Sequence, residues 1–172
     1  MIYISSFLKF INMKKESSRL DWKVAEEISD LPKKEAKLLA LATSSLADAY
    51  APYSKFQVGA AVLLKNGKMI GGSNQENAAY PMCLCAERVA LSAAASQYPK
   101  MLIHSMAITV KAPHQVVNQP AMPCGACRQA LCELEFQQKK NIKLVVRGEQ
   151  GDIYVFKSAK DILPFSFDAS FL

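Results

Sequence analysis

Three cysteines and one glutamate are the residues whose types and spacing could carry chemistry. Cys124 and Cys127 lie three positions apart in a Pro-Cys-Gly-Ala-Cys run, where the proline is typical of a first helical turn. Side chains at i and i+3 share one face of a helix, so both thiolates can bind one ion. Cys85, in the run Cys85-Ala86-Glu87, supplies a third thiolate from the start of another expected helix. Three soft sulfur ligands favour zinc and leave one tetrahedral position open for water, as in catalytic zinc sites.

Glu87 is a candidate to exchange protons with a water at that open position. Residues two apart point away from each other on a regular helix, so Cys85 and Glu87 can converge only at a helix entrance. There Glu87 can take a proton from the water and later deliver it to a substrate. Three thiolates leave a zinc centre with a net charge of about −1, which opposes ionisation of its water. Two helix N-termini and the adjacent Arg88 are expected to offset that charge. We therefore predict one Zn²⁺ per subunit, with Cys85, Cys124 and Cys127 as ligands, Glu87 as catalytic residue and Arg88 as charge-tuning residue.

Other cysteine arrangements remain open at this point. Cys83 could join the other three to form a closed structural site with four cysteines, which needs no glutamate and does no chemistry. The Cys124–Cys127 pair could instead be a redox dithiol, which would leave the third cysteine and the glutamate without a role. Cys132 lies off the ligand face, and we expect it to be a core cysteine.

The elements that position these residues follow from the spacing of apolar side chains. A helix is expected from Pro32 to Tyr50, since its apolar positions form one stripe. Two further helices, over residues 85–97 and 123–136, begin at the cysteine motifs. The connection between the last two strands is too short for a crossover, so these strands should be antiparallel. The expected strands cover residues 58–64, 69–73, 103–110, 143–147 and 153–156. Together they predict a layered α/β domain with a mixed sheet.

Composition limits the class of protein. A chain of 172 residues with 51% hydrophobic and 21% charged residues has the size and composition of one soluble globular domain that needs no disulfides. No apolar run approaches the ~20 residues that would cross a bilayer. The net charge of +6 is spread along the chain, without a basic segment that contains interleaved aromatics. We therefore expect neither a nucleic acid nor a membrane as partner.

The N-terminal region requires separate treatment. The run 2–11 is apolar, but no basic residue precedes it and no small-residue cleavage site follows, so we expect no secretory signal and a cytoplasmic location. Met13 would serve as a start, and residues 1–12 would then be an upstream extension or a disordered arm. We expect an N-terminal extension over 1–31, partly disordered or helical, and a single domain over 32–172.

Taken in order, the motifs resemble the cytidine deaminases that act on free nucleosides. The similarity extends from about Leu38 to Phe167, with Gln75 and Cys83 at positions where members commonly have Val and Gly. The matching elements are Ala49 to Ser54, Phe56, Val58 to Ala61, Asn74 to Ala78, Tyr80-Pro81, Cys85 to Arg88, Pro123 to Gln129, and Leu163-Pro164 with Phe167.

This resemblance implies a fold and a reaction. The fold is a three-layer α/β/α cytidine-deaminase-like fold, with a mixed sheet of about five strands and an antiparallel last strand. The reaction is the zinc-dependent hydrolytic deamination of cytidine and deoxycytidine to uridine and deoxyuridine, part of pyrimidine salvage, by a hydrolase that cleaves a cyclic amidine C–N bond. A deaminase of a modified aminonucleoside is the alternative within the same fold.

The resemblance also assigns substrate-binding roles. Phe56 looks like the aromatic residue that packs on the pyrimidine, and Asn74 and Glu76 look like the pair that hydrogen-bonds the ribose hydroxyl. Ala86 is the remaining residue that the resemblance implies to bind substrate within the same subunit. Free pyrimidine nucleosides are therefore the expected partners.

Two aromatic residues carry an expectation about assembly. Tyr80 and Phe167 resemble residues that complete a neighbouring subunit's pocket in tetrameric members of the family. The resemblance therefore implies a homotetramer with shared active sites.

Overall fold

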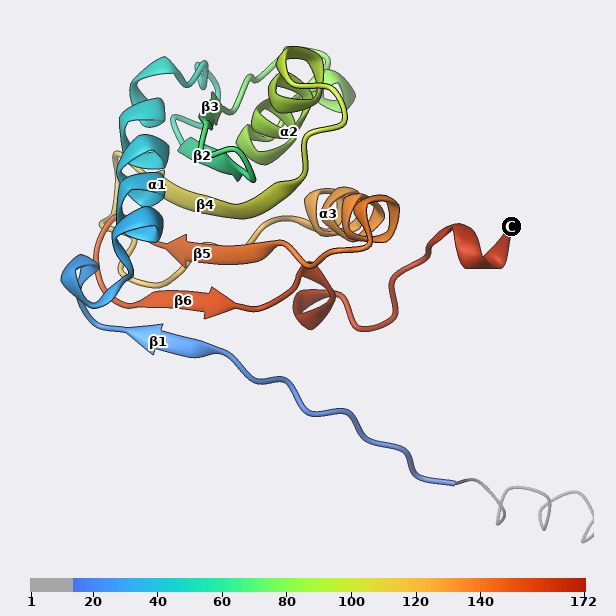
Figure 1. Cartoon of the computed structure of the whole chain (residues 1–172). Helices are drawn as coiled ribbons and strands as arrows, with labels where there is room; N and C mark the ends of the chain where they lie inside the picture. Colours follow the sequence, from blue (N-terminus) through green and yellow to red (C-terminus); the bar gives the residue numbers. More distant parts are fainter. Residues whose placement is uncertain (1–13) are drawn as a thin grey trace, which may run out of the picture.

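The protein is described by a computed structural model of residues 14–172, and these residues form one six-stranded mixed sheet (Figure 1). The strand order is β1-β6-β5-β4-β2-β3, and β4 and β5 form the one parallel pair among these strands. The expected arm over residues 1–12 and the suggested start at Met13 lie outside the described residues. The strands are β1 (Lys23–Ala25), β2 (Gln57–Leu64), β3 (Met69–Ser73), β4 (Ile103–Lys111), β5 (Lys143–Arg147) and β6 (Ile153–Phe156).

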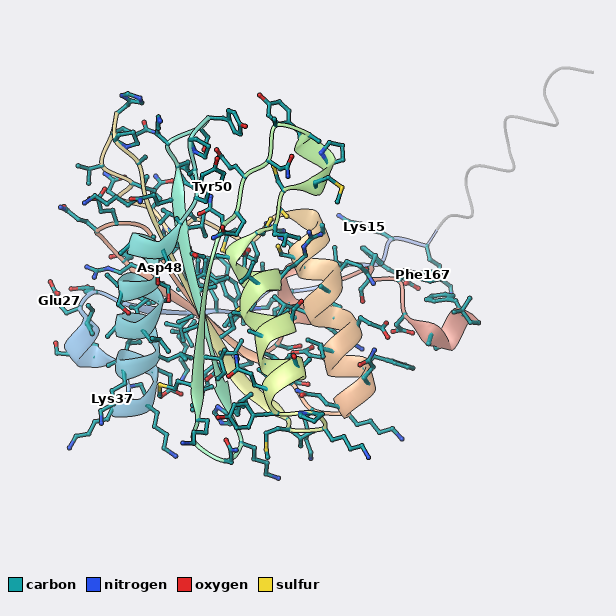
Figure 2. The ribbon with its side chains drawn as sticks, turned by 90° about the horizontal axis from the view of Figure 1, so that it is seen from above. Lys15, Glu27, Lys37, Asp48, Tyr50 and Phe167 are labelled. Atoms are coloured by element: carbon teal, nitrogen blue, oxygen red, sulfur yellow. The ribbon has the colours of Figure 1, made fainter. Side chains whose placement is uncertain are left out.

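Helices cover both faces of the sheet and make three layers. Helix α1 (Lys33–Ser44) lies on one face, and α2 (Ala86–Gln97) and α3 (Gly125–Gln138) lie on the other, as Figure 2 shows from above. The predicted three-layer α/β/α fold and the antiparallel last strand are confirmed. Five short 3₁₀ helices complete the elements of residues 14–172: η2 (Ile28–Asp30), η3 (Ser45–Asp48), η4 (Tyr80–Met82), η5 (Ala159–Ile162) and η6 (Ala169–Phe171). No helix between residues 14 and 172 is both long and apolar enough to span a bilayer.

The sheet has one strand more than the predicted number of about five. The additional strand is β1, which pairs antiparallel with β6 in the register Lys23↔Val155 and Ala25↔Ile153. It lies within the range 1–31 that the sequence analysis assigns to an extension. A three-residue strand has too little alternation to be recognised from sequence, because tertiary pairing decides whether it forms.

The first helix ends earlier than expected. It was predicted to reach Tyr50, but α1 ends at Ser44 and the chain continues as the 3₁₀ helix η3. The hydroxyls of Ser44 and Ser45 both donate hydrogen bonds to the carbonyl of Leu41, at 2.9 and 3.0 Å. Such side-chain bonds compete with the α-helical pattern, and this explains the change in helix type.

Two glycines let helices pack directly on the strands. A Cβ atom added at Gly72 in β3 would lie 2.5 Å from the backbone nitrogen of Ala90 and 2.8 Å from the carbonyl oxygen of Ala86. A Cβ atom at Gly59 in β2 would lie 2.0 Å from the carbonyl oxygen of Ala42. The absence of side chains at both positions brings the backbones of α2 and α1 against the sheet. The N-terminus of α2, where Cys85 lies, is thereby held in place.

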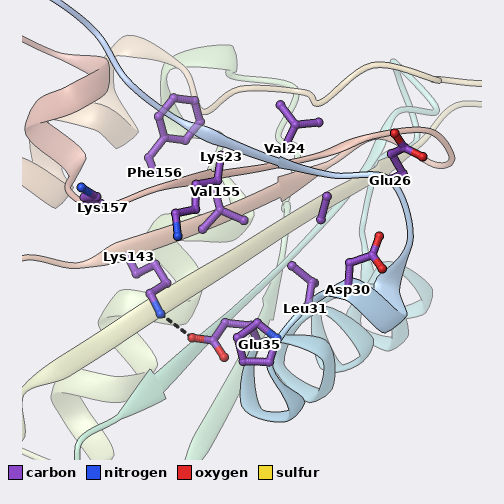
Figure 3. A pocket seen from close by; sticks show the side chains of 12 residues that line it. Lys23, Val24, Glu26, Asp30, Leu31, Glu35, Lys143, Val155, Phe156 and Lys157 are labelled. Atoms are coloured by element: carbon purple, nitrogen blue, oxygen red, sulfur yellow. Dashed lines mark hydrogen bonds and ion pairs between the residues drawn. The ribbon is translucent and has the colours of Figure 1, made fainter.

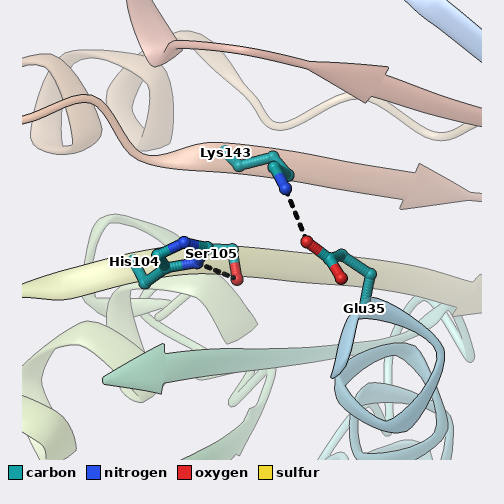
Figure 4. A network of polar contacts seen from close by, with 4 residues as sticks. All are labelled: Glu35, His104, Ser105 and Lys143. Atoms are coloured by element: carbon teal, nitrogen blue, oxygen red, sulfur yellow. Dashed lines mark hydrogen bonds and ion pairs between the residues drawn. The ribbon is translucent and has the colours of Figure 1, made fainter. Parts of the chain in front are cut away.

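An ion pair joins helix α1 to strand β5. The Nζ atom of Lys143 on β5 donates to a carboxylate oxygen of Glu35 at 2.5 Å, and Glu35 is only 5% exposed (Figure 4). Burial raises the pKa of Glu35, but the hydrogen bond from Lys143 and its positive charge lower it by more. His104 makes a smaller contribution, and the pKa of Glu35 lies below its usual 4.5. Figure 3 shows this pair at the edge of a cavity of about 680 Å³ between α1, β1 and β6. Its lining includes Pro32 and Glu35 at the start of α1, which places it on the α1 face of the sheet, and α2 and α3 lie on the opposite face.

Candidate active site

The three predicted metal ligands meet where the N-termini of α2 and α3 come together. Cys85 is the N-cap residue of α2 and Cys124 is the N-cap residue of α3, while Cys127 lies in the first turn of α3. The Sγ atoms of Cys85 and Cys124 are 3.7 Å apart, and those of Cys124 and Cys127 are 3.5 Å apart. Within residues 14–172, this is the one cluster of three or more side chains that could hold a metal ion.

The spacing of the sulfurs suits zinc. Tetrahedral zinc with Zn–S bonds of about 2.3 Å places its sulfur ligands roughly 3.8 Å apart. All three Sγ atoms lie within 4.8 Å of one another, in the range that such an ion requires. A set of three thiols is chemically soft and leaves one tetrahedral position for a ligand from solution. The residues present therefore fit a catalytic zinc ion.

The local electrostatics favour a thiolate at Cys85. The pKa of Cys85 is lowered to about 6, mainly by the hydrogen bond from the Cys127 thiol. The Cys124 hydrogen bond and the charge of Arg88 also lower this pKa, whereas burial and the charge of Glu87 raise it. The hydrogen bond between Cys127 and Cys85, together with burial, raises the pKa of Cys127. Backbone N–H groups at the two helix N-termini also stabilise negative charge at this point. The cluster can therefore release protons in favour of a metal ion.

Glu87 lies beside this cluster and faces a cavity. It is the second residue of α2, is 3% exposed, and lines a cavity of about 470 Å³ together with Cys85 and Cys124. Because Cys85 is the extended N-cap residue, with a ψ of 148°, the two side chains can face the same space although they are two residues apart. Cys85 and Glu87 therefore line one cavity at the start of α2.

The rest of this cavity has the size and lining of a small-molecule site. Apolar side chains form most of its wall, and its polar side chains are Glu87 beside the cysteines and Ser54, Asn74, Gln75 and Glu76. Such a combination of an apolar wall with a few placed polar groups is typical of pockets for small organic ligands. The apolar side chains that line it are Phe56, Val58, Leu84, Ile108, Val110, Ala121 and Met122.

Asn74 and Glu76 line the cavity and also form hydrogen bonds with nearby backbone groups. Asn74 accepts a hydrogen bond from the Val58 N–H at 2.8 Å and donates to the Phe56 carbonyl at 2.9 Å. Glu76 accepts from the N–H groups of Tyr53 and Ser54 and from the Ser54 hydroxyl. The hydroxyl hydrogen bond is the main reason that the pKa of Glu76 is lowered. Asn74 keeps one lone pair and one N–H, and Glu76 keeps one lone pair, that a ligand could use.

Ala86 and Arg88 occupy two different positions on the first turn of α2. The side chain of Ala86 is fully buried in the core, so only its backbone could reach a ligand. Arg88 donates a hydrogen bond to the carbonyl of Cys83 at 3.3 Å, and its positive charge lowers the pKa of Cys85. Arg88 is therefore close enough to influence the charge of the cluster.

Cys83 lies outside the cluster of three thiols. Its Sγ atom accepts a hydrogen bond from the N–H of Asn77 at 3.2 Å and donates to the carbonyl of the same residue at 3.6 Å. The closed site of four cysteines would need this sulfur beside the other three. The structure instead uses Cys83 to close the loop before α2. As expected, Cys132 is a core residue, 1% exposed, and burial raises its pKa.

Tyr80 and Phe167 do not line the 470 Å³ cavity of their own chain. Tyr80 is 71% exposed beside Tyr53, and Phe167 is 57% exposed on the C-terminal segment beyond α3 (Figure 2). The ring of Phe167 stacks on Phe171 with centroids 5.4 Å apart, and Gln129 donates to the Phe167 carbonyl at 2.7 Å. Both aromatic side chains are thus presented outward.

The structure adds residues that the motifs did not single out for the site. Ser54 positions the Glu76 carboxylate, and Met122 lines the cavity immediately before the cysteine loop. Arg128 holds that loop, because its Nε atom donates to the Pro123 carbonyl at 2.8 Å and its Nη1 atom donates to the Ile162 carbonyl at 3.0 Å. A serine after a tyrosine or a methionine before a proline has no distinctive pattern, so only the tertiary structure shows what these side chains contact.

Comparison with known proteins agrees with this geometry. Residues 32–142 match the family model of the cytidine and deoxycytidylate deaminase zinc-binding region. The chain is 43% identical over 121 residues to a cytidine deaminase of Halalkalibacterium halodurans, which covers 70% of this chain and 84% of the relative. It is 38% identical over 131 residues to the cytidine deaminase of Sporosarcina psychrophila, covering 76% and 89% of the two chains.

Solved structures are similar in the same way. The crystal structure of cytidine deaminase from Burkholderia pseudomallei superposes with a TM-score of 0.67 at 39% identity, covering 76% of this chain and 97% of that one. Cytidine deaminase from Mycobacterium tuberculosis gives a TM-score of 0.58 at 31% identity, with coverages of 76% and 94%. The matched region contains the three clustered thiols and Glu87. A chain with this fold, this thiol cluster and these relatives belongs to the cytidine deaminase family of hydrolytic deaminases.

Proposed function

We propose that this protein deaminates cytidine and deoxycytidine to uridine and deoxyuridine, with release of ammonia, and that it serves pyrimidine salvage. One observation carries the proposal: the buried carboxylate of Glu87 lines the same cavity as two of the three thiols that fit zinc. A structural zinc site would not need a carboxylate beside it or a cavity in front of it. The family membership supports the same reaction class.

We infer that Cys85, Cys124 and Cys127 hold one Zn²⁺ ion per subunit. When bound, this zinc supplies an acidified water as the nucleophile. Glu87 is the proton carrier: its carboxylate would accept a proton from the water and deliver it to N3 of the pyrimidine, then accept the proton of the hydroxyl added at C4 and deliver it to the departing amine. Its burial excludes bulk water from these transfers. Arg88 keeps the cluster from becoming too negative for that role.

The remaining residues would bind and orient the nucleoside. We assign the packing on the pyrimidine ring to Phe56, which lines the apolar wall. Asn74 and Glu76, which line the same cavity, would use their free hydrogen-bonding positions for the ribose hydroxyl. Ala86 would contribute backbone groups at the first turn of α2, since its side chain is buried.

We also propose a homotetramer in which neighbouring subunits share active sites. The support is the outward presentation of Tyr80 and Phe167, which do not reach the cavity of their own chain. Large exposed aromatic side chains favour burial against another surface. The cytoplasmic location expected from the sequence stays a prediction.

The proposal is tested by metal content and turnover on the same purified protein. We expect about one zinc per chain and a loss of cytidine absorbance in the ultraviolet as uridine forms. Deoxycytidine is assayed in parallel. Cytosine tests whether the substrate needs a sugar, and deoxycytidylate tests whether a phosphate on the sugar is tolerated. Zinc without turnover of cytidine or deoxycytidine would contradict the proposal.

A further inference from the structure

The N-terminal segment before the matched region lines a hollow that shares one residue with the substrate cavity. Residues 32–142 match the family model, so β1 and the residues before it lie outside that match. Val24 of β1 stands opposite Tyr154 of β6, and the side chains of directly paired residues share one face of a sheet. The alternation along the strand places Trp22 on this same face, toward α3.

Aromatic stacking holds Trp22 on that face. The centroid of its ring system lies 5.8 Å from that of Tyr154 and 6.3 Å from that of Phe156. Phe156 is 3% exposed and belongs to the core between the sheet and the helices α2 and α3. Trp22 itself remains 45% exposed, so it covers the edge of this core rather than filling it.

Met122 connects this edge to the substrate cavity. A hollow of about 340 Å³ is lined by Leu20, Trp22 and Met122, among other residues. Met122 also lines the 470 Å³ cavity that contains Glu87, and it is the residue common to both linings. Met122 thus separates the hollow beneath Trp22 from the space proposed for the nucleoside.

Hydrogen bonds fix the backbone beside Met122, whereas its side chain lies between two cavities. Arg128 ties the carbonyl of the next residue, Pro123, to the carbonyl of Ile162 through two hydrogen bonds of 2.8 and 3.0 Å. A methionine side chain has three rotatable bonds and adapts to the free volume around it. Because the Met122 side chain has a cavity on each side, its position depends on the residues that line the hollow. Trp22 has the largest side chain among these residues.

We propose that Trp22 is a positioning residue for the substrate cavity and acts by holding Met122 as one wall of it. This inference rests on the proposed function, because its main effect is on nucleoside binding. Met122 contacts the space for the substrate but is no proton donor or acceptor. Loss of Trp22 should therefore weaken binding more than it slows the chemical step.

The first test is a set of variants in the full chain. Trp22→Ala should raise KM for cytidine by about 3- to 10-fold with a smaller change in kcat, and Trp22→Phe should restore most of the loss. Lys23→Ala is the matched control, because Lys23 lies on the opposite face of β1, and its KM should equal that of the wild type. Zinc content and circular dichroism should be unchanged in all three variants. An unchanged KM in Trp22→Ala, or a loss of zinc or secondary structure, would overturn the inference.

The second test separates an effect through Met122 from a general one. In a double-mutant cycle, Trp22→Ala should raise KM much less when Met122 is already replaced by Ala. If the two substitutions instead raise KM in the double variant by the product of their single effects, the inference is overturned. An inactive wild-type protein would instead contradict the proposed function, which distinguishes the two failures.

The third test needs no turnover. Trp22 is the single tryptophan of the chain, so its fluorescence reports on this position alone. Binding of uridine to the cavity should change its emission in the wild type, and Met122→Ala should reduce that change. Uridine binding that is detected by calorimetry but leaves the emission unchanged would overturn the inference.

Discussion

The thiols of Cys85 and Cys124 lie 3.7 Å apart although 39 residues separate them in the chain. Each is the N-cap residue of a helix, so the contact also brings two helix N-termini together. The direct packing of α2 on β3 at Gly72 helps to make this contact possible. The candidate metal site therefore depends on how two helices lie against the sheet.

Substitution of single cysteines should separate the ligands from Cys83. Cys85→Ser should lose most of its zinc, because a hydroxyl is a harder and less acidic ligand than a thiol. Cys83→Ser should keep both zinc and activity, because the Cys83 sulfur bonds to the Asn77 backbone and lies outside the cluster. Zinc analysis of both purified variants measures this. Loss of zinc in Cys83→Ser would favour the closed site of four cysteines.

Glu87→Gln should reduce kcat by about 10²- to 10⁴-fold, because an amide cannot carry the protons. Zinc content and the unfolding midpoint should stay near those of the wild type, since Glu87 is not counted among the ligands. Steady-state kinetics and metal analysis test this together. Full activity, or loss of zinc, would show that Glu87 is not the proton carrier.

Another buried glutamate, Glu135, provides the matched control. Glu135 is 4% exposed and accepts hydrogen bonds from the Ile142 and Ala159 N–H groups and from the Ser158 hydroxyl. Glu135→Gln should lower the free energy of unfolding by roughly 1–3 kcal/mol. Its kcat should remain that of the wild type, because Glu135 does not line the substrate cavity.

Arg88→Ala should lower kcat by about 10- to 100-fold and affect KM less. Without the guanidinium, one cause that lowers the pKa of Cys85 is lost, and the cluster becomes more negative. A more negative centre ionises its water at higher pH, so the pH–rate profile should shift toward alkaline values. Arg88→Lys keeps the charge and should shift the profile less. Identical profiles for wild type and Arg88→Ala would mean that Arg88 does not tune the centre.

Lys143→Met should destabilise the protein in a pH-dependent way. The pKa of Glu35 is lowered in the folded protein, so its ion pair stabilises the fold above the usual pKa of 4.5 and is lost as the pH falls through the lowered value. We expect a loss of roughly 1–3 kcal/mol in the free energy of unfolding at neutral pH, and a smaller difference in acid. Urea unfolding at several pH values measures it.

Lys157→Met is the control for this prediction. Lys157 lines the same cavity but forms no ion pair within the described residues 14–172 (Figure 3). Its loss should change stability little at any pH. A difference between wild type and Lys143→Met that persists in acid would show that the ion pair is not the cause.

Phe167→Ala should raise KM for cytidine if Phe167 completes a neighbouring site. Mixing Phe167→Ala subunits with Glu87→Gln subunits tests the sharing directly. Some sites in mixed tetramers combine an intact Glu87 with an intact Phe167, so activity at low substrate should exceed that of either parent. After proven subunit exchange, a mixture no better than its parents would contradict the shared site.

Local spacing predicted most of the site because its key residues belong to short motifs at helix starts. The i, i+3 pair Cys124 and Cys127 and the neighbours Cys85 and Glu87 are set by backbone geometry over a few residues. The long strands and helices were likewise predictable, since their apolar periodicity is a local property.

Tertiary structure decided the features that depend on distant partners. Strand β1 exists because β6 offers it an edge, and Trp22 stacks on rings more than a hundred residues away. Cys83 and Cys85 are nearly adjacent in sequence, yet only Cys85 joins the cluster, because the Asn77 backbone holds the other sulfur. Burial, pairing and hydrogen bonding between separated segments set these outcomes, and no short stretch of sequence contains that information.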